Sequence, residues 1–232
     1  MSQLPDGQTA AAGQAAADHT RQDFWRKENL NFSKPHYRLE KARRIIEKAA
    51  GGRECTLLDV GCGPATLMHM LPPNVHYYGI DIAIQRPAPN LLEADIVKAP
   101  IGFNGIRFDI VHAQGIFEYV GDVQSRKFAE IAGLLKDDGV FIVSYWNFSH
   151  RNPQDYFAHT NIQTIAEFRD DLSRHFTVDR FFPASHNFHQ HWPGHKLTQA
   201  ISMHVNLNIP VISPRLAVEY FACCSARPPR AG

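Results

Sequence analysis

Three aspartates follow short apolar segments of the chain, where a folded protein could present their carboxylates to a ligand. Asp59 stands just before Gly61 and Gly63, and Asp81 and Asp95 come further along the chain. Glycines let the backbone turn sharply and approach a ligand that a Cβ atom would hold off. A carboxylate at the end of an apolar segment can accept hydrogen bonds from two adjacent ribose hydroxyls. These residues predict a binding site for a small polar molecule, with Asp81 as the candidate ribose acid.

Short apolar runs alternate with helical periodicity and indicate the elements that position these aspartates. Strand-length runs fall at 56–60, 75–80, 91–94, 108–113, 140–145, 177–182 and 216–225, and helical spacing falls at 39–49, 67–71, 123–135 and 162–175. This alternation predicts an α/β fold with an open, doubly wound, mostly parallel sheet and helices on both faces. Ligands of such sheets bind beyond the carboxyl ends of the strands, where the three aspartates fall.

The composition fits one globular domain without a strong field for a charged partner. The chain has 232 residues, 44% of them apolar, with 24 Lys and Arg against 23 Asp and Glu. A net charge of +1 argues against nucleic acid or an anionic membrane as a partner. No apolar run reaches the roughly 18 residues of a spanning helix. Four cysteines in a chain of this length are not the framework of a small secreted domain, and no leader pattern is present, so we expect a cytoplasmic protein.

The composition also predicts how the chain is divided. Residues 1–20, rich in Ala, Gly and Gln, and residues 226–232 are expected to be disordered tails. Residues 21–225 are expected to form one domain. Within it, the long stretch at 183–215, rich in His, Asn and Pro, is too long for a plain hairpin and predicts a functional insertion.

Five segments, taken in order, resemble the motifs of class I S-adenosylmethionine-dependent methyltransferases of the small-molecule type. They read LLDVGCGPA, YYGIDI, LLEADI, FDIVHAQGIFEYV and LLKDDGVFIV. The likeness extends from Tyr37 to Ser225, and Ala65 stands where the family often has a third glycine. The resemblance implies a Rossmann-like methyltransferase fold, with a seven-stranded sheet whose last strand is antiparallel. It also implies S-adenosylmethionine as the cofactor and S-adenosylhomocysteine as the product.

No metal is expected, and the resemblance further implies which residues bind the cofactor. They are Asp59, Gly61, Gly63 and Gln114 at the methionine end, Tyr37 in the N-terminal segment, Asp81 at the ribose, and Asp95, Ile82 and Ile96 at the adenine. The simpler alternative is that the acids are strand-end caps and the glycines form an ordinary turn.

Two other classes of protein share parts of this pattern. An NAD(P)-dependent Rossmann oxidoreductase also places an acid after its second strand, but its G-x-G-x-x-G motif needs a glycine where Thr66 stands. Asp95 and the long insertion fit a methyltransferase better. A non-catalytic cofactor-binding protein on the same fold is the second alternative, because fold does not fix function.

The segment that follows the fourth strand indicates the class of methyl acceptor. The Asn/Asp-Pro-Pro-Tyr/Phe tetrapeptide of amino-directed nucleic-acid methyltransferases is absent, and residues 114–119 are similar to the Glu-His-Val-type segment of small-molecule enzymes. Tyr119 replaces the frequent histidine and either orients the acceptor or is a packed aromatic. We expect methylation of an O or N nucleophile of a small metabolite, such as a sugar or natural-product intermediate.

The N-terminal part of the domain, residues 21–50, carries an aromatic series that resembles the lid of many small-molecule members. The series comprises Phe24, Trp25, Phe32 and Tyr37. In those members the segment folds over the cofactor. The alternative is a helix that packs on the edge of the sheet.

Four histidines, His186, His189, His191 and His195, lie within the insertion at 183–215. Histidine titrates near neutral pH and can take a proton from an acceptor, so His189 or His191 is the candidate general base and the insertion the candidate acceptor wall. Imidazoles at this spacing can also bind zinc, although no cysteine joins them and the spacing fits no zinc pattern. A polar surface loop whose histidines only form hydrogen bonds is the third alternative.

Overall fold

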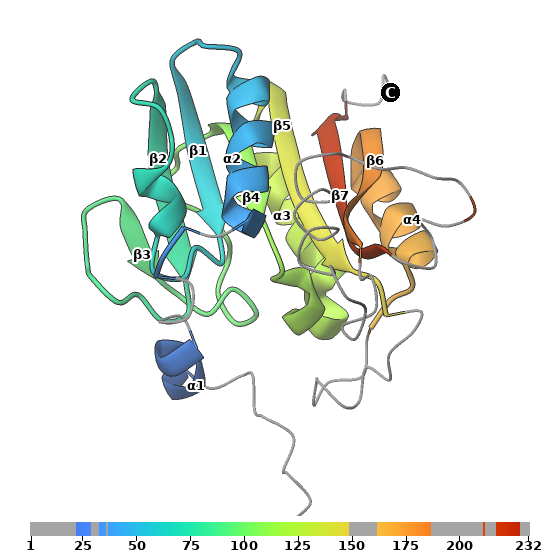
Figure 1. The fold of residues 1–232 in the computed structure, drawn as a ribbon, viewed down its shortest axis with the longest axis horizontal. Coiled ribbons are helices and arrows are strands. Elements are labelled where there is room, and N and C mark those ends of the chain that lie inside the picture. Colours follow the sequence, from blue (N-terminus) through green and yellow to red (C-terminus); the bar gives the residue numbers. More distant parts are fainter. Residues whose placement is uncertain are drawn as a thin grey trace, which may run out of the picture.

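The computed structural model describes residues 22–28, 33–35, 37–148, 162–186, 211 and 217–227, whose strands form one seven-stranded sheet (Figure 1). In chain order the strands are β1 (Cys55–Val60), β2 (Val75–Asp81), β3 (Leu91–Glu93), β4 (Phe108–Ala113), β5 (Leu135–Trp146), β6 (Phe176–His186) and β7 (Ala217–Ala226). The strand order is β3-β2-β1-β4-β5-β7-β6, and β7 runs antiparallel to both of its neighbours while the other pairs are parallel. This confirms the predicted doubly wound α/β fold with an antiparallel last strand.

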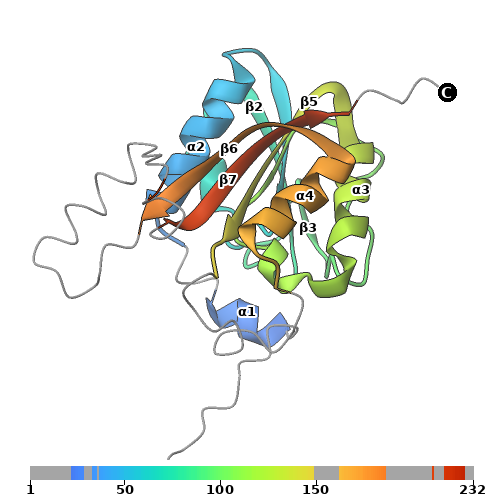
Figure 2. The same ribbon diagram turned by 90° about the vertical axis from the view of Figure 1, so that its right-hand side faces the viewer.

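Helices cover both faces of the sheet, and one short helix lies beyond the carboxyl ends of the strands (Figures 1 and 2). The helices are α1 (Gln22–Glu28), α2 (Tyr37–Ala50), α3 (Gln124–Leu134) and α4 (Ile165–His175), and the 3₁₀ turns are η2 (Thr66–His69), η3 (Phe117–Tyr119) and η4 (Gly121–Val123). Figure 2 shows α2 on one face and α3 and α4 on the other. The short helix α1 is at the bottom of Figure 1, at the end of the sheet where β1 and β5 finish.

The α2 helix packs on the sheet through one apolar side. Ala42 and Ile46 are fully buried in this interface, and burying an Ile side chain contributes about 1.5–3 kcal/mol. On its outer side Arg43 pairs with Glu40 at 2.7 Å. The helix ends at Ala50, and the next residue, Gly51, has a φ of +59°, the left-handed conformation that commonly closes a helix.

The central strands β1 and β4 are buried on both faces, which explains their nearly continuous apolar sequences. Two polar side chains interrupt these runs near the carboxyl ends. They are Asp59 in β1 and His112 in β4, which are register partners on the same face of the sheet. Buried polar side chains need hydrogen-bond partners, and the partners of Asp59 and His112 are described with the site below.

Two strands differ from their predicted bounds by more than one residue. The strand predicted at 140–145 begins earlier, because Leu135 already pairs with Phe108 and the register shifts before Val140 pairs with Ile110. In β6 the pairing with β7 continues through Pro183 to His186, so residues 183–186 of the predicted insertion belong to this strand, and most of its remainder lies outside the described residues. A proline is tolerated there because β6 is the edge strand of the sheet.

Candidate active site

The loop after β1 is built on glycine. Gly61 has a φ of +77°, and the N–H groups of Gly61 and Cys62 both donate to the carbonyl of Ile80, at 2.8 and 3.1 Å. A Cβ atom at Gly61 would lie 2.9 Å from Cδ1 of Ile116, so both conformation and space favour glycine here. Ala65, where the family often has glycine, also adopts a positive φ of 54°. For a residue with a Cβ atom this conformation costs roughly 1–2 kcal/mol.

Asp81 ties the glycine loop to the end of β2. Its Oδ2 atom accepts the N–H of Gly63 at 2.7 Å, and its Oδ1 atom accepts the N–H of Ala83 at 2.8 Å. The side chain is buried and lies on the wall of a cavity at the carboxyl ends of the strands. The backbone of two loops therefore fixes the direction of this carboxylate.

The segment after β3 forms the neighbouring wall of the cavity. Oδ1 of Asp95 accepts the N–H of Val97 at 3.0 Å, and Oδ2 of Asp95 lies 2.9 Å from Nζ of Lys98. Ile96 is buried, and Ile82 contributes to the same cavity. This wall offers one carboxylate between two branched apolar side chains.

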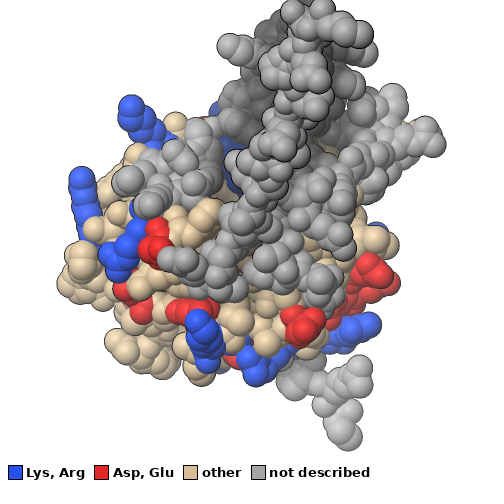
Figure 3. Space-filling view, turned by 90° about the horizontal axis from the view of Figure 1, so that it is seen from below, with Lys and Arg blue, Asp and Glu red and all other residues tan. Residues whose placement is uncertain are grey.

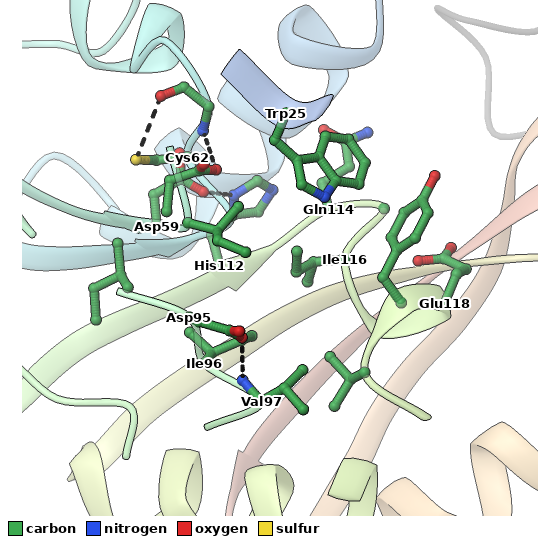
Figure 4. Close-up of a pocket in the computed structure, with 18 of the residues that line it drawn as sticks. Trp25, Asp59, Cys62, Asp95, Ile96, Val97, His112, Gln114, Ile116 and Glu118 are labelled. Carbon is green, nitrogen blue, oxygen red and sulfur yellow. Dashed lines mark hydrogen bonds and ion pairs between the residues drawn. The ribbon is translucent and has the colours of Figure 1, made fainter. Parts of the chain in front are cut away.

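A buried hydrogen-bonded chain crosses β2, β1 and β4 beside the cavity. The hydroxyl of Tyr77 donates to Oδ2 of Asp59 at 2.7 Å. Oδ1 of Asp59 lies 2.7 Å from Nδ1 of His112 (Figure 4). Burial, and then the charge of Asp59, raise the pKa of Tyr77, so its hydroxyl remains a donor. His112 is 2% exposed and lines the cavity, and its Nε2 atom has no hydrogen-bond partner among the described residues.

A second buried polar cluster joins α2, β5 and β7. Oε1 of Glu219 lies 2.8 Å from Nη2 of Arg38 and accepts the hydroxyl of Ser144 at 2.7 Å, while Nε2 of Gln114 lies 3.4 Å away. Burial alone would raise the pKa of Glu219, but the charge and hydrogen bond of Arg38 outweigh it and lower the pKa. Arg38 and Gln114 both reach the cavity wall.

The opposite end of the cavity is aromatic and contains a buried acid. Trp25, Tyr119, Trp146 and Phe148 line this end together with Glu118. Oε1 of Glu118 accepts the backbone N–H of Trp146 at 2.7 Å. Figure 4 shows Glu118 well separated from Asp59 and Cys62. The cavity thus has an end rich in aspartate and an aromatic end.

The helix α1 brings Trp25 to the cavity. The rings of Trp25 and Tyr119 meet edge to face with their centroids 4.9 Å apart. Arg26 pairs with Glu93 of β3 at 3.3 Å through exposed side chains, a type of contact that contributes little stability.

The segment predicted as a lid contains two helices. Helix α2 packs on the face of the sheet and reaches the cavity through Arg38 and Leu39, whereas α1 brings Trp25 to it. A lid function of α1 stays a prediction.

Most of the predicted site residues meet at one cavity of about 640 Å³. Those that line it are Asp59, Gly61, Gly63, Asp81, Ile82, Asp95, Ile96, Gln114 and Tyr119. The side chain of Tyr37 and the whole of His189 and His191 lie outside the described residues, so their roles stay predictions. Sequence reasoning missed His112 and Glu118, although both are polar residues inside the quoted motif FDIVHAQGIFEYV.

A family model described as a methyltransferase domain matches residues 35–200, and the chain belongs to this family. No curated protein matches the chain. The NodS N-methyltransferase of Bradyrhizobium japonicum, solved with S-adenosylhomocysteine, is 10% identical over 91% of this chain and 100% of its own, with a TM-score of 0.59. The 1,6-didemethyltoxoflavin-N1-methyltransferase of Burkholderia thailandensis is 16% identical over 89% of this chain and 85% of its own, with a TM-score of 0.58.

A third solved structure is a putative methyltransferase in complex with the Haloferax volcanii Trm112 methyltransferase activator. It is 15% identical over 90% of this chain and 97% of its own, with a TM-score of 0.61. At identities this low the likeness to these structures is one of fold. Together with the family match, it identifies the chain as an S-adenosylmethionine-dependent methyltransferase of the class I fold.

The cavity fits this cofactor by its donor and acceptor groups. The buried Nε2 atom of His112 lacks a partner in the described part of the chain, and a polar ligand group would supply one. Asp81 offers a fixed carboxylate, while Ile82 and Ile96 offer apolar contact.

Within the described residues, no group of three or more His, Cys, Asp or Glu side chains could hold a metal ion. None of the helices described is long and apolar enough to cross a membrane.

Proposed function

We propose that this enzyme transfers a methyl group from S-adenosylmethionine to an O or N nucleophile of a small metabolite. The observation that carries the proposal is a continuous cavity of about 640 Å³ with polar groups at one end and aromatic side chains at the other. Such a cavity can hold a cofactor and a small acceptor next to each other, which is the main requirement of a bimolecular transfer.

The aspartate-rich end is proposed to bind the cofactor. Asp81 would accept hydrogen bonds from the ribose, Asp95 would bind the adenine amino group, and Ile82 and Ile96 would contact the purine. The glycine loop at 61–63 would approach the methionine end closely, because neither glycine carries a Cβ atom. Two observations support the assignment. Backbone N–H groups fix the direction of the Asp81 carboxylate, and the glycines leave room in the loop for a ligand.

Asp59 and His112 are proposed to act at the methionine end as a unit. With Nδ1–H of His112 donating to the Asp59 carboxylate, the neutral ring presents the lone pair of Nε2 to the cavity. An α-ammonium group would supply the missing donor. Gln114, held near Glu219, would lie beside the same part of the cofactor.

The bound cofactor supplies an electrophilic methyl group on a sulfonium, and the residues of the chain align the acceptor and exclude water. Trp25 and Tyr119 contact each other at the aromatic end and reduce its exposure to solvent. Tyr119 is proposed to orient the acceptor. The proposal that His189 or His191 acts as a base stands on the sequence alone.

The surface around the carboxyl ends of the strands supports a small acceptor rather than a nucleic acid. Figure 3 shows Lys and Arg side chains interspersed with Asp and Glu side chains over the described part of this face. Nucleic-acid binding depends on clustered positive charge. Among the similar structures, the Burkholderia thailandensis enzyme was solved with 1,6-didemethyltoxoflavin and S-adenosylhomocysteine bound.

Transfer of label from methyl-labelled S-adenosylmethionine tests this proposal. The purified protein is incubated separately with the small-metabolite, RNA, DNA and protein fractions of a cell extract. We expect label in the small-metabolite fraction, and none with Asp81→Ala, which removes the proposed ribose acid. Label confined to a macromolecular fraction would show that the acceptor class is wrong.

A further inference from the structure

Glu118 is a buried carboxylate on the cavity wall with an unused oxygen. The residue is 2% exposed, and its Oε1 atom accepts the N–H of Trp146, whereas its Oε2 atom has no partner among the described residues. Most buried polar atoms in proteins have a hydrogen-bond partner. An unpartnered oxygen beside a cavity therefore indicates that a ligand supplies the donor.

The charges around Glu118 favour a positive ligand. Arg38, from α2, is the cation facing it, but Arg38 already forms a 2.8 Å ion pair with Glu219 from β7. Tyr145 of β5 also faces Glu118, and burial raises the pKa of Tyr145, so the phenol stays neutral. Arg38 is thus shared between two carboxylates, and the nearby cation Lys41 acts on Glu219 rather than on Glu118. Burying an ionised Glu118 without a cation of its own would be costly.

The aromatic side chains at the same end of the cavity strengthen this preference. Tyr119 follows Glu118 in sequence, and its ring meets that of Trp25. Trp146 and Phe148 also line the cavity, although the ring of Trp146 already faces the guanidinium of Arg38, 5.9 Å away. Aromatic rings attract cations through their electron-rich faces. A neutral hydroxyl could donate a hydrogen bond to the carboxylate but would gain neither the ion pair nor the attraction of a cation to the rings.

We propose that the methyl acceptor is a protonated amine, bound through its ammonium group to Oε2 of Glu118 beside these aromatic rings, and that Glu118 takes its proton. This inference rests on the proposed function and narrows its acceptor to an amine. The N–H proton moves to Oε2, and the freed nitrogen lone pair forms the bond to the methyl carbon. The C–S bond breaks with its electron pair left on sulfur, which gives S-adenosylhomocysteine and a protonated N-methylamine.

The protonation behaviour of Glu118 is consistent with this role. Burial raises its pKa to about 7, and the charge of Glu219 also raises it, whereas the backbone N–H groups of Glu118 itself and of Trp146 and the charge of Arg38 lower it. A base of this pKa is half ionised at neutral pH, and a bound ammonium would favour its ionised form. The value of kcat/KM, which reports ionisations of the free enzyme, should therefore rise with pH through about 7, and kcat should rise at lower pH.

Binding of matched amines and alcohols tests the proposal without requiring the natural acceptor. With S-adenosylhomocysteine saturating, calorimetry compares phenethylamine with 2-phenylethanol, and benzylamine with benzyl alcohol. Wild type should bind each amine about tenfold or more tightly than its alcohol, as expected for a charge-assisted contact. Glu118→Gln should lose this preference while its affinity for S-adenosylhomocysteine stays within about twofold of wild type. Glu54→Gln, which removes an exposed charge, is the matched control.

Three results would overturn the proposal. One is that wild type binds amine and alcohol equally well, or binds neither. This comparison does not depend on the folding of any variant. Another is an amine preference that persists in Glu118→Gln. The third is a selective loss in Glu118→Gln of affinity for S-adenosylmethionine relative to S-adenosylhomocysteine, because the carboxylate would then serve the sulfonium. Failure of wild type to bind S-adenosylhomocysteine would instead contradict the cofactor site itself.

Discussion

Replacing Asp81 with alanine is expected to weaken the binding of S-adenosylhomocysteine by at least about 100-fold. The variant loses the acceptor of the Gly63 and Ala83 N–H groups, at 2.7 and 2.8 Å, as well as the proposed ribose contact. Hydrogen bonds to a charged group contribute about 1.5–3 kcal/mol each, and every 1.4 kcal/mol or so changes the affinity tenfold. Isothermal titration calorimetry measures the change directly.

Asp109→Ala is the matched control for this result. Asp109 is also buried and accepts a backbone N–H, that of Thr56 at 2.8 Å, but it lies at the beginning of β4 and away from the cavity. We expect Asp109→Ala to lower the free energy of unfolding and to leave the affinity within about twofold of wild type. Wild-type affinity in Asp81→Ala would show that Asp81 does not bind the cofactor.

Glu219→Gln is expected to lower the free energy of unfolding by about 3 kcal/mol at neutral pH. Removing one partner of a buried ion pair typically costs about 3–5 kcal/mol, and the 20% exposure of Arg38 places this pair at the lower end. The exposed pair of Arg53 and Asp138 supplies the control, since Asp138→Asn should change stability by about 0.5 kcal/mol or less. Urea denaturation of both variants measures the difference.

The loss in Glu219→Gln should also depend on pH. The folded-state pKa of Glu219 lies below the ordinary value of 4.5, so its ionised form stabilises the fold above that value. This stabilisation is lost as the pH falls through the folded-state pKa. The difference between wild type and variant should therefore shrink under acid conditions, and a difference that is constant with pH would contradict the ion-pair account.

The sequence predicted the parts of the site that depend on local pattern. The apolar runs at Asp59 and Asp81 are the ends of β1 and β2, because mostly buried strands inside a sheet need nearly continuous apolar sequence. Asp95 comes two residues after β3, an edge strand with exposed residues. The turn at Gly61 was predictable for the same kind of local reason, since its φ of +77° suits glycine. These features need no knowledge of the tertiary partners.

The polar pairs of the site could not be predicted because they join distant elements. Arg38 and Glu219 are 181 positions apart in the chain, and their contact exists because β7 inserts between β5 and β6. His112 depends on the register that places it opposite Asp59. The length of β6 likewise follows from pairing with β7, not from the local sequence around Pro183. Glu118 could be recognised as an acid in the sequence, but its burial could not be predicted from it.

The position of the cofactor site is tested most directly by hydrogen–deuterium exchange with and without S-adenosylhomocysteine. The strand-end site predicts that the ligand slows amide exchange in the segments at 61–65, 81–84, 95–98 and 114–119, whose residues line or border the cavity. Exchange at the opposite ends of the strands, near 53–56 and 106–109, should remain unchanged. Protection confined to segments outside this cavity, or no protection at saturating ligand, would contradict the assignment of the cofactor to the ends of β1, β2 and β4.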